Sequence, residues 1–340
     1  MTEPCAENLW TMNDSEFMSL LVERCSEEKP RRIRFYAPSF MHYKSIDFCS
    51  RLNDFPTISV TGKGCSLKCK HCGGIVLNTM YPATTPAALY ELCKRLKSDG
   101  ARGCLISGGC LPNGSVPLKE FVDTICRVKR DFGLTVFVHT GIIDHATAEA
   151  LKNANVDAAL FDIIGSEETI KDVYRLDISL KDYKDSLRAL NDAQIVYVPH
   201  VIVGLHHGKL MGEFTALKMV SSFRPSALVI IAFMPIRGTE MASVKPPESI
   251  DIAKVIFIAR KMFPRTPLVL GCMRSQGRER SQTEILAMQA GIDAIAFPTE
   301  PAVKFAKNSG CIVSFSPMCC AQIYLDAKNS VISGSRQLPS

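Results

Sequence analysis

The chain has 340 residues, of which 46% are hydrophobic, and a formal net charge of +6. Such a chain can bury a full core, and its mild basicity without a basic tract or an aromatic-interleaved patch argues against nucleic-acid binding. No apolar run approaches the length of a membrane span, and the first thirty residues are too acidic and polar for a signal peptide. Because 14 cysteines in so large a chain do not resemble a secreted disulfide scaffold, we expect a reducing, cytoplasmic location.

Residues 1–52 are expected to form an N-terminal extension. Helical apolar spacing covers residues 10–24, a charged linker containing Pro30 follows, and residues 34–38 could form a short apolar strap. We expect one barrel domain over residues 53–310 and a C-terminal tail over residues 311–340.

Three cysteines, Cys65, Cys69 and Cys72, stand at Cx3Cx2C spacing directly after an apolar strand-like run. Three thiolates this close together predict a loop around one [4Fe-4S] cluster, with one iron left open because such clusters normally take four cysteines. Zinc is the alternative, but zinc takes four ligands, typically from two separated pairs, and His71 is too close to Cys72 to be an easy fourth.

From residue 54 onward, strand-like and helical patterns alternate. Alternation of this kind predicts right-handed βαβ units and a parallel sheet, which eight units close most simply into an α/β fold of the (β/α)8 TIM-barrel type. A doubly wound open sheet is the alternative. The strand-like runs are residues 57–60, 104–107, 134–139, 158–162, 195–203, 227–233, 267–271 and 294–297, and the helical runs are residues 86–97, 118–130, 145–153, 180–190, 213–222, 250–262 and 282–290.

The Cx3Cx2C loop after a first strand resembles the signature of the radical S-adenosylmethionine (radical SAM) superfamily. The resemblance implies that Cys65, Cys69 and Cys72 bind a [4Fe-4S] cluster and that the methionine part of SAM chelates its open iron. It also implies reductive cleavage of SAM to a 5′-deoxyadenosyl radical that abstracts a substrate hydrogen. One departure is His71, where the family usually has an aromatic residue.

In a barrel the chemistry lies on the loops after the strands. Gly108 and Gly109 match the family's GGE-like motif for the methionine amino group, with Cys110 where an acid is common. Asp162 ends an apolar strand and needs a partner, which a ribose hydroxyl pair would supply. The full set expected to bind SAM is Gly108, Gly109, Cys110, His139, Asp162, Arg175, His200, Gly204 and Met234.

The other members of this set have individual reasons and alternatives. Arg175 could clamp the methionine carboxylate, although a surface salt bridge is equally expected. His200 and Gly204 resemble the family's GxIxGxxE stretch, with His207 where the acid often lies. His139 and Met234 could equally be ordinary residues at the edge of the core.

A cysteine and three arginines follow the seventh predicted strand. This segment resembles the biotin synthase branch, where an arginine helps to ligate an auxiliary cluster, and Arg274 is the matching position. The cysteines of the biotin synthase cluster do not carry over. Cys319 and Cys320 in the tail could close over the barrel mouth and, with Cys272 or an N-terminal cysteine, hold a second iron–sulfur cluster, or could be incidental thiols.

The overall layout resembles the archaeal-type split lipoyl synthases. That resemblance implies sulfur insertion into an octanoyl chain on a carrier protein, either a lipoyl domain or a glycine-cleavage H-type protein. The implied partners are a second, related radical SAM protein and a ferredoxin or flavodoxin as electron donor. The arginines expected to dock the carrier are Arg237, Arg278 and Arg280.

Two other functions stay open. One is a single-cluster radical SAM isomerase, lyase or methylating enzyme that acts on a small carboxylate. The other is a non-catalytic iron–sulfur partner protein.

Overall fold

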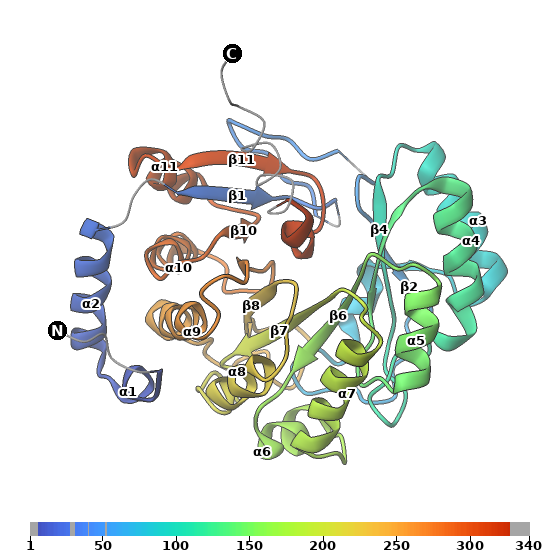
Figure 1. The fold of residues 1–340 in the computed structure, drawn as a ribbon, viewed down its shortest axis with the longest axis horizontal. Coiled ribbons are helices and arrows are strands. Elements are labelled where there is room, and N and C mark those ends of the chain that lie inside the picture. The colour runs from blue at the N-terminus through green and yellow to red at the C-terminus, as the bar shows by residue number, and fades with distance from the viewer. Residues whose placement is uncertain (1–5, 28–30, 40, 52, 327–340) are drawn as a thin grey trace.

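Eleven parallel strands form one curled sheet with helices on its outer side (Figure 1). The computed structural model describes residues 6–27, 31–39, 41–51 and 53–326. The strand order is β11-β1-β10-β9-β8-β7-β6-β5-β4-β2-β3, and among the described residues the two edge strands do not pair with each other. The predicted α/β fold of the TIM-barrel type is confirmed, as a half-barrel that stays open between β3 and β11.

All eight predicted strands are present. They are β2 (Thr57–Ser59), β4 (Gly103–Ser107), β5 (Thr135–His139), β6 (Ala158–Ile163), β7 (Tyr197–Val203), β8 (Leu228–Ala232), β9 (Leu268–Leu270) and β10 (Ala294–Ala296). The remaining strands, which the alternation did not predict, are β1 (Arg32–Tyr36), β3 (Tyr81–Pro82) and β11 (Ile312–Ser316).

Strand β1 comes from the segment that the sequence analysis placed in the N-terminal extension. It pairs in parallel with β10 on one side and β11 on the other. Ile33 and Phe35 are fully buried, whereas Arg32 is exposed. Because Arg32 and Arg34 interrupt its apolar residues, the sequence pattern does not predict this strand. The extension and the tail each contribute a strand to the same sheet.

The seven predicted helices are confirmed, and local capping explains several of their ends. Thr85 accepts a hydrogen bond from the Ala88 amide at the start of α3, and Asp144 accepts one from the Thr147 amide at the start of α5. These helices are α3 (Pro86–Ser98), α4 (Val122–Phe132), α5 (His145–Asn153), α7 (Leu180–Asp192), α8 (Glu213–Ser221), α9 (Ser249–Met262) and α10 (Arg278–Gln289).

Four further α-helices of the described residues surround this set. Helices α1 (Ala6–Thr11) and α2 (Asp14–Glu27) pack beside α9, where the Lys254 ammonium donates to the Met12 carbonyl at 2.6 Å. Helix α11 (Glu300–Asn308) covers β11, and a short helix α6 (Glu167–Thr169) follows β6. None of the helices in the described ranges has both the length and the apolar character that crossing a membrane requires.

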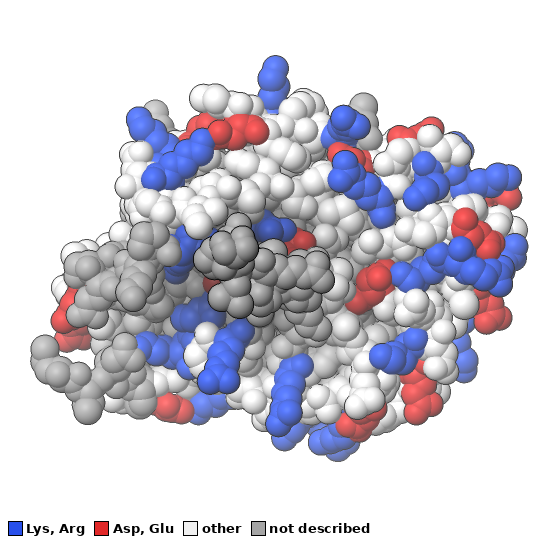
Figure 2. Space-filling view, turned by 45° about the horizontal axis from the view of Figure 1, so that its top comes forward, with Lys and Arg blue, Asp and Glu red and all other residues white. Residues whose placement is uncertain are grey.

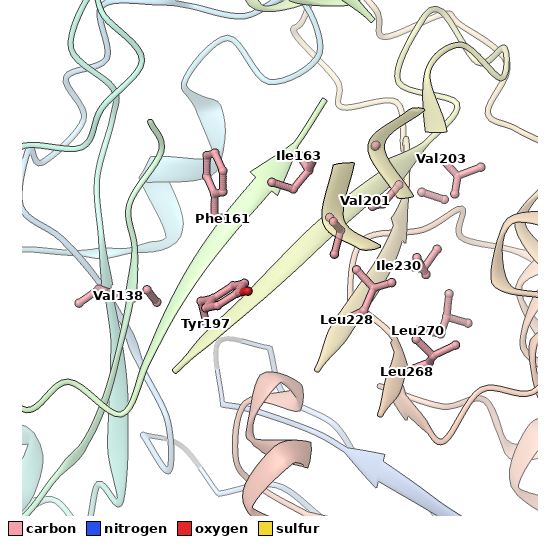
Figure 3. Close-up of a cluster of buried hydrophobic side chains, with 14 of the residues drawn as sticks. Val138, Phe161, Ile163, Tyr197, Val201, Val203, Leu228, Ile230, Leu268 and Leu270 are labelled. Carbon is pink, nitrogen blue, oxygen red and sulfur yellow. The ribbon is translucent and has the colours of Figure 1, made fainter. Parts of the chain in front are cut away.

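Side chains alternate between the two faces of the sheet, as they must along any strand. Figure 3 shows the outward set, which packs under the helices and includes Phe161, Val201, Ile230 and Leu270. The inward set, which fills the interior of the curled sheet, includes Phe137, Leu160, Val198, Val229 and Val269.

The tail completes this interior. Met318, Cys320, Ile323 and Tyr324 are buried with the inward side chains of the strands. The Tyr324 hydroxyl donates to the Asp157 carbonyl at 2.7 Å, just before β6 begins. The tail therefore fills the half-barrel from within.

Candidate functional site

A cavity of about 640 Å³, lined mostly by apolar side chains, opens at the carboxyl ends of the strands. Its wall brings together residues from the cysteine loop, from six strand ends and from the tail. The sequence-predicted residues on this wall are Cys65, Cys69, Cys72, Gly108, Gly109, Cys110, His139, Asp162, His200, Met234, Cys272, Cys319 and Cys320. A single chamber thus collects most of the residues that the sequence singled out.

The cysteine loop is a tight turn after β2. The amides of Cys72 and Gly73 both donate to the Cys69 carbonyl, at 3.1 and 2.7 Å. Gly73 and Gly74 follow with φ of 53° and 78°, a left-handed conformation that favours glycine. The turn presents the thiols of Cys65, Cys69 and Cys72 to the cavity.

The thiols of Cys69 and Cys72 are electrostatically coupled. Donation from Cys69 and contact with His71 lower the pKa of Cys72 to about 4, although burial opposes the change. The same hydrogen bond and burial raise the pKa of Cys69. Thiolates are the ligands of iron–sulfur clusters, so the loop already favours one ligand in its charged form.

His71 lies in the cysteine loop, at the position where the resembled family usually has an aromatic residue. Its ring packs on Tyr174, with ring centroids 5.2 Å apart, and its Nδ1 is buried without a hydrogen-bond partner. An imidazole thus fills the site that an aromatic ring would occupy and leaves one polar atom buried without a partner.

Gly109 permits the end of β4 to lie against the cysteine loop. A Cβ at this position would lie 2.0 Å from the Gly64 carbonyl oxygen and 2.6 Å from the Cys65 Cβ. The Gly109 amide donates to Thr61 Oγ1 at 2.6 Å, and the Ser66 amide donates to the Cys110 carbonyl at 2.8 Å.

Cys110 stands in place of an acid and is a different chemical group. Burial, with smaller contributions from Cys65 and Asp162, raises the pKa of the Cys110 thiol to about 12. The side chain is therefore a neutral thiol, so that only the backbone of Gly108 and Gly109 remains to serve a ligand amine at this strand end.

His139, Asp162 and His200 come together on three adjacent strands, with His139 and Asp162 at the ends of β5 and β6 and His200 midway along β7. His139 Nε2 lies 3.3 Å from Asp162 Oδ1, and the rings of His139 and His200 have centroids 5.9 Å apart. Burial alone would raise the pKa of Asp162, but His139 outweighs burial and lowers it to about 2. Burial lowers the pKa of His200 to about 4, so Asp162 is a carboxylate beside a neutral imidazole.

Two residues of the predicted SAM set do not line the cavity. Arg175 pairs with Glu240 on the surface and donates to the Lys68 carbonyl at 3.3 Å, so it supports the cysteine loop from outside. Gly204 has a φ of 71° and lies under Pro247, whose ring carbons a Cβ would meet at 2.7 Å.

Glu213, on α8, is the acid that supports Gly204 at the end of β7, and it was not among the predicted site residues. Its Oε1 accepts the Gly204 amide at 2.8 Å, while its Oε2 is buried without a partner. His207, in the expected acid position, pairs instead with Asp172 at 2.6 Å. The only sequence signal for Glu213 is an acid in the first turn of a helix, which is too common to be selective.

Arg274 is fully buried and does not line the cavity. Its terminal nitrogens donate to the carbonyls of Gly271 at 2.6 Å and Ala296 at 2.7 Å, and to Glu284 at 2.5 Å. Glu284 in turn accepts from Thr299 at 2.7 Å. Instead of being directed at a ligand, the predicted cluster arginine ties together the ends of β9 and β10 with α10.

The arginines predicted to dock a carrier lie in different environments. Arg280 is largely buried and donates to Glu284, Gln276 and the Phe297 carbonyl. Arg237 is exposed beside Ile236, which lines the cavity. Arg278 begins α10, but its side chain lies outside the described part of the structure.

Cys272, Cys319 and Cys320 form a second group of thiols on the cavity wall. Cys320 donates to Cys319 and thereby lowers the pKa of the Cys319 thiol. Burial, followed by the influence of Cys319, raises the pKa of Cys272 to about 11. The tail cysteines thus reach the same chamber as the Cx3Cx2C loop.

This arrangement fits the cofactors that the cysteine loop implies. Three thiols on one turn, an adjacent glycine strand end and a chamber large enough for a small molecule are the elements needed to hold a cluster and its ligand. The cofactors that this core fits are a [4Fe-4S] cluster and S-adenosylmethionine, and Cys65, Cys69 and Cys72 are the residues that would supply the thiolate donors.

Comparisons with known proteins agree with the geometry. The chain is 23% identical over 252 residues to a biotin synthase of Hyphomonas neptunium, covering 70% of this chain and 75% of that one. It is 25% identical over 280 residues to a biotin synthase of Acidithiobacillus ferrooxidans, covering 78% and 84%.

Solved structures share the fold. Methylornithine synthase (PylB) has a TM-score of 0.57 at 17% identity, covering 86% of this chain and 81% of that one. HydG, a maturase of the [FeFe]-hydrogenase, has a TM-score of 0.64 at 14% identity, covering 97% and 75%. The model of the radical SAM superfamily matches residues 59–209, which include the cysteine loop and β4 to β7. The chain is thus similar to radical SAM proteins over residues 59–209 and has low-identity relatives among the biotin synthases.

Proposed function

We propose that this radical SAM enzyme inserts sulfur into an unactivated C–H bond. The observation that carries the proposal is the second thiol group, Cys272, Cys319 and Cys320, on the wall of the chamber that also receives the cluster cysteines. A second iron–sulfur cluster held there would lie where a substrate radical forms and would supply the sulfur. The biotin synthase relatives support this class of reaction.

The proposed substrate is an octanoyl chain on a carrier-protein lysine, as in lipoyl synthesis. The cavity wall supports an aliphatic guest, because Leu205, Ile231, Phe233 and Ile236 contribute apolar surface. When bound, the cluster and SAM supply the radical that removes hydrogen. The role of the chain is to exclude water and to orient the target carbon.

Partners follow from the same proposal: a carrier protein (lipoyl domain or H-type protein), a second radical SAM protein and a ferredoxin or flavodoxin. Arg237, exposed beside the cavity, is the described arginine best placed to meet an acidic carrier. Figure 2 shows basic and acidic side chains interspersed over one face of the molecule, so docking would depend on local pairs.

Anaerobic reconstitution tests the second cluster. Two cubane clusters would give about eight irons per chain, and a Cys272→Ser/Cys319→Ser/Cys320→Ser variant would give about four. About four irons in both proteins would remove the sulfur-donor proposal and favour a single-cluster isomerase, lyase or methylating enzyme. The matched control is Cys126→Ser, because Cys126 is an exposed thiol on α4 and does not line the cavity.

Turnover tests the reaction. With SAM and a reductant, we expect 5′-deoxyadenosine, and with an octanoylated carrier peptide and the partner protein we expect the peptide to gain the mass of sulfur. Formation of 5′-deoxyadenosine without a gain of sulfur would exclude lipoyl synthesis but keep a radical SAM enzyme. Absence of 5′-deoxyadenosine from fully reconstituted protein would leave only the non-catalytic iron–sulfur role.

A further inference from the structure

Three ionisable residues share one level of the otherwise mostly apolar cavity. His139 and Asp162 end the inward rows of β5 and β6, after Phe137 and Leu160, whereas His200 follows Val198 midway along β7 and Ile202 lies beyond it on the same face. Asp162 is the register partner of His200 across the ladder between β6 and β7. Because side chains alternate along a strand, this placement directs all three into the chamber.

Their spacing is that of ligands around a single ion. One ligand atom from each residue lies within 4.8 Å of the other two. Imidazole nitrogens and carboxylate oxygens bind metals such as zinc at about 2.0–2.2 Å, so atoms around one ion are at most about 4.4 Å apart. Small side-chain rotations would therefore bring the three atoms onto one ion without moving the strands.

The protein itself does not fully satisfy these groups. The contact between His139 and Asp162 is a single long hydrogen bond of 3.3 Å, and His200 Nδ1 is buried without a partner. Polar groups in an apolar wall are costly unless a partner satisfies them. The ribose hydroxyls of SAM would satisfy Asp162 but would not explain two imidazoles that converge on it.

We propose that His139, Asp162 and His200 bind one divalent metal ion, in addition to the iron–sulfur chemistry of the cysteines. Two imidazoles and one carboxylate suit Mn(II), Fe(II) or Zn(II) and leave coordination positions open towards the cavity. The open positions would take a polar oxygen or nitrogen of the substrate and so fix its orientation beside SAM. This role replaces the predicted SAM contacts of these three residues and does not depend on sulfur insertion.

Binding of Mn(II) to the cluster-loaded protein tests the site, because Mn(II) prefers oxygen and nitrogen ligands and competes poorly for thiolates. Electron paramagnetic resonance of free Mn(II) during an anaerobic titration should show one tightly bound ion per chain. His139→Gln/His200→Gln and Asp162→Asn should each weaken this binding at least tenfold while keeping the wild-type cluster absorbance and iron content.

The matched control is His206→Gln/His207→Gln, which removes a neighbouring histidine pair that contacts Thr169 and Asp172 outside the chamber wall. This control should retain the bound Mn(II). The proposal would be overturned if wild type, His139→Gln/His200→Gln and Asp162→Asn bound Mn(II) with equal affinity. It would also be overturned if wild type retained no more Mn(II), Co(II) or Zn(II) than these two variants.

Addition of SAM separates the metal site from a SAM subsite. We expect SAM to leave Mn(II) bound and Asp162→Asn to keep the affinity for SAM within about twofold. If SAM releases the metal and Asp162→Asn loses SAM, the triad belongs to the SAM site and the proposal fails. Sulfur insertion is judged separately, by iron content and peptide mass, so failure of one proposal does not imply failure of the other.

Discussion

At the scale of single residues, the sequence was most informative where the chemistry is local. Cys65, Cys69 and Cys72 lie within eight positions, so their spacing alone predicts a shared ligand, and the structure places all three on the cavity. Arg274 shows the opposite case. Its partners Glu284 and Ala296 are distant in sequence, so nothing local indicates that its terminal nitrogens are bound inside the fold.

Gly109→Ala should prevent stable incorporation of the cluster. The added methyl group would meet the Gly64 carbonyl oxygen at 2.0 Å, a backbone atom that can move only if the cysteine loop moves. We expect loss of most of the iron after reconstitution. Gly100→Ala is the control, because its Cβ meets nothing within 4 Å while its φ of +94° still imposes the usual strain. Equal iron content in the two variants would contradict this account of Gly109.

Glu213→Gln should change how stability depends on pH. Burial raises the pKa of Glu213 to about 7, although the Gly204 amide opposes the change. The folded protein therefore keeps a proton that the unfolded chain releases between about pH 4.5 and 7, so this carboxyl contributes stability at low pH that is lost as pH rises through 7.

Thermal denaturation of wild type and Glu213→Gln from pH 5 to 8 measures the effect. As pH rises from 5 to 8, the wild-type melting temperature should fall relative to that of the variant. The corresponding change in the free energy of unfolding, relative to the variant, is about 2–3 kcal/mol. Glu149→Gln, an exposed substitution on α5, should leave the wild-type profile unchanged. Parallel profiles for wild type and Glu213→Gln would show that Glu213 is ionised throughout.

At the scale of elements, alternating strand-like and helical patterns predicted eight strands and seven helices. This was possible because each βαβ unit of the core shows its apolar periodicity within its own short stretch of sequence. Strand β1 was not predicted because Arg32 and Arg34 interrupt its apolar residues, and β11 was not predicted because only its last residue, Ser316, is buried. Both strands are specified by pairing with segments far away in sequence. The site residues that depend on such pairing, Cys319 among them, could be selected by type but not placed.

Arg274→Ala should loosen the β9–α10–β10 corner. The substitution leaves the Glu284 carboxylate buried without its main partner, and breaking a buried pair in this way costs about 3–5 kcal/mol. Arg237→Ala, on the exposed loop after β8, should change stability by no more than about 0.5 kcal/mol. Melting temperatures of the two variants in one buffer measure this difference in stability. An Arg274→Ala variant as stable as wild type would show that the hydrogen bonds of Arg274 are dispensable for the fold.

At the scale of the whole molecule, an open half-barrel needs something to fill its interior and close its chamber. The tail does both: Tyr324 packs against Phe137 with ring centroids 6.5 Å apart, and Cys319 and Cys320 reach the cavity wall. Sequence reasoning treated the tail as a separate segment over the mouth, because a chain end carries no periodic signal. Its actual position, inside the sheet, couples packing of the core to the second thiol group.

Tyr324→Ala tests this coupling. Loss of the buried ring and of the hydrogen bond to the Asp157 carbonyl should cost on the order of 3 kcal/mol and lower the melting temperature. Tyr324→Phe keeps the ring and should cost only about 1 kcal/mol. If the tail positions the second thiol group, Tyr324→Ala should also lose the iron that depends on Cys272, Cys319 and Cys320 while keeping the iron of the Cx3Cx2C loop. A destabilised variant with full iron content would show that Tyr324 stabilises the core without positioning the tail cysteines.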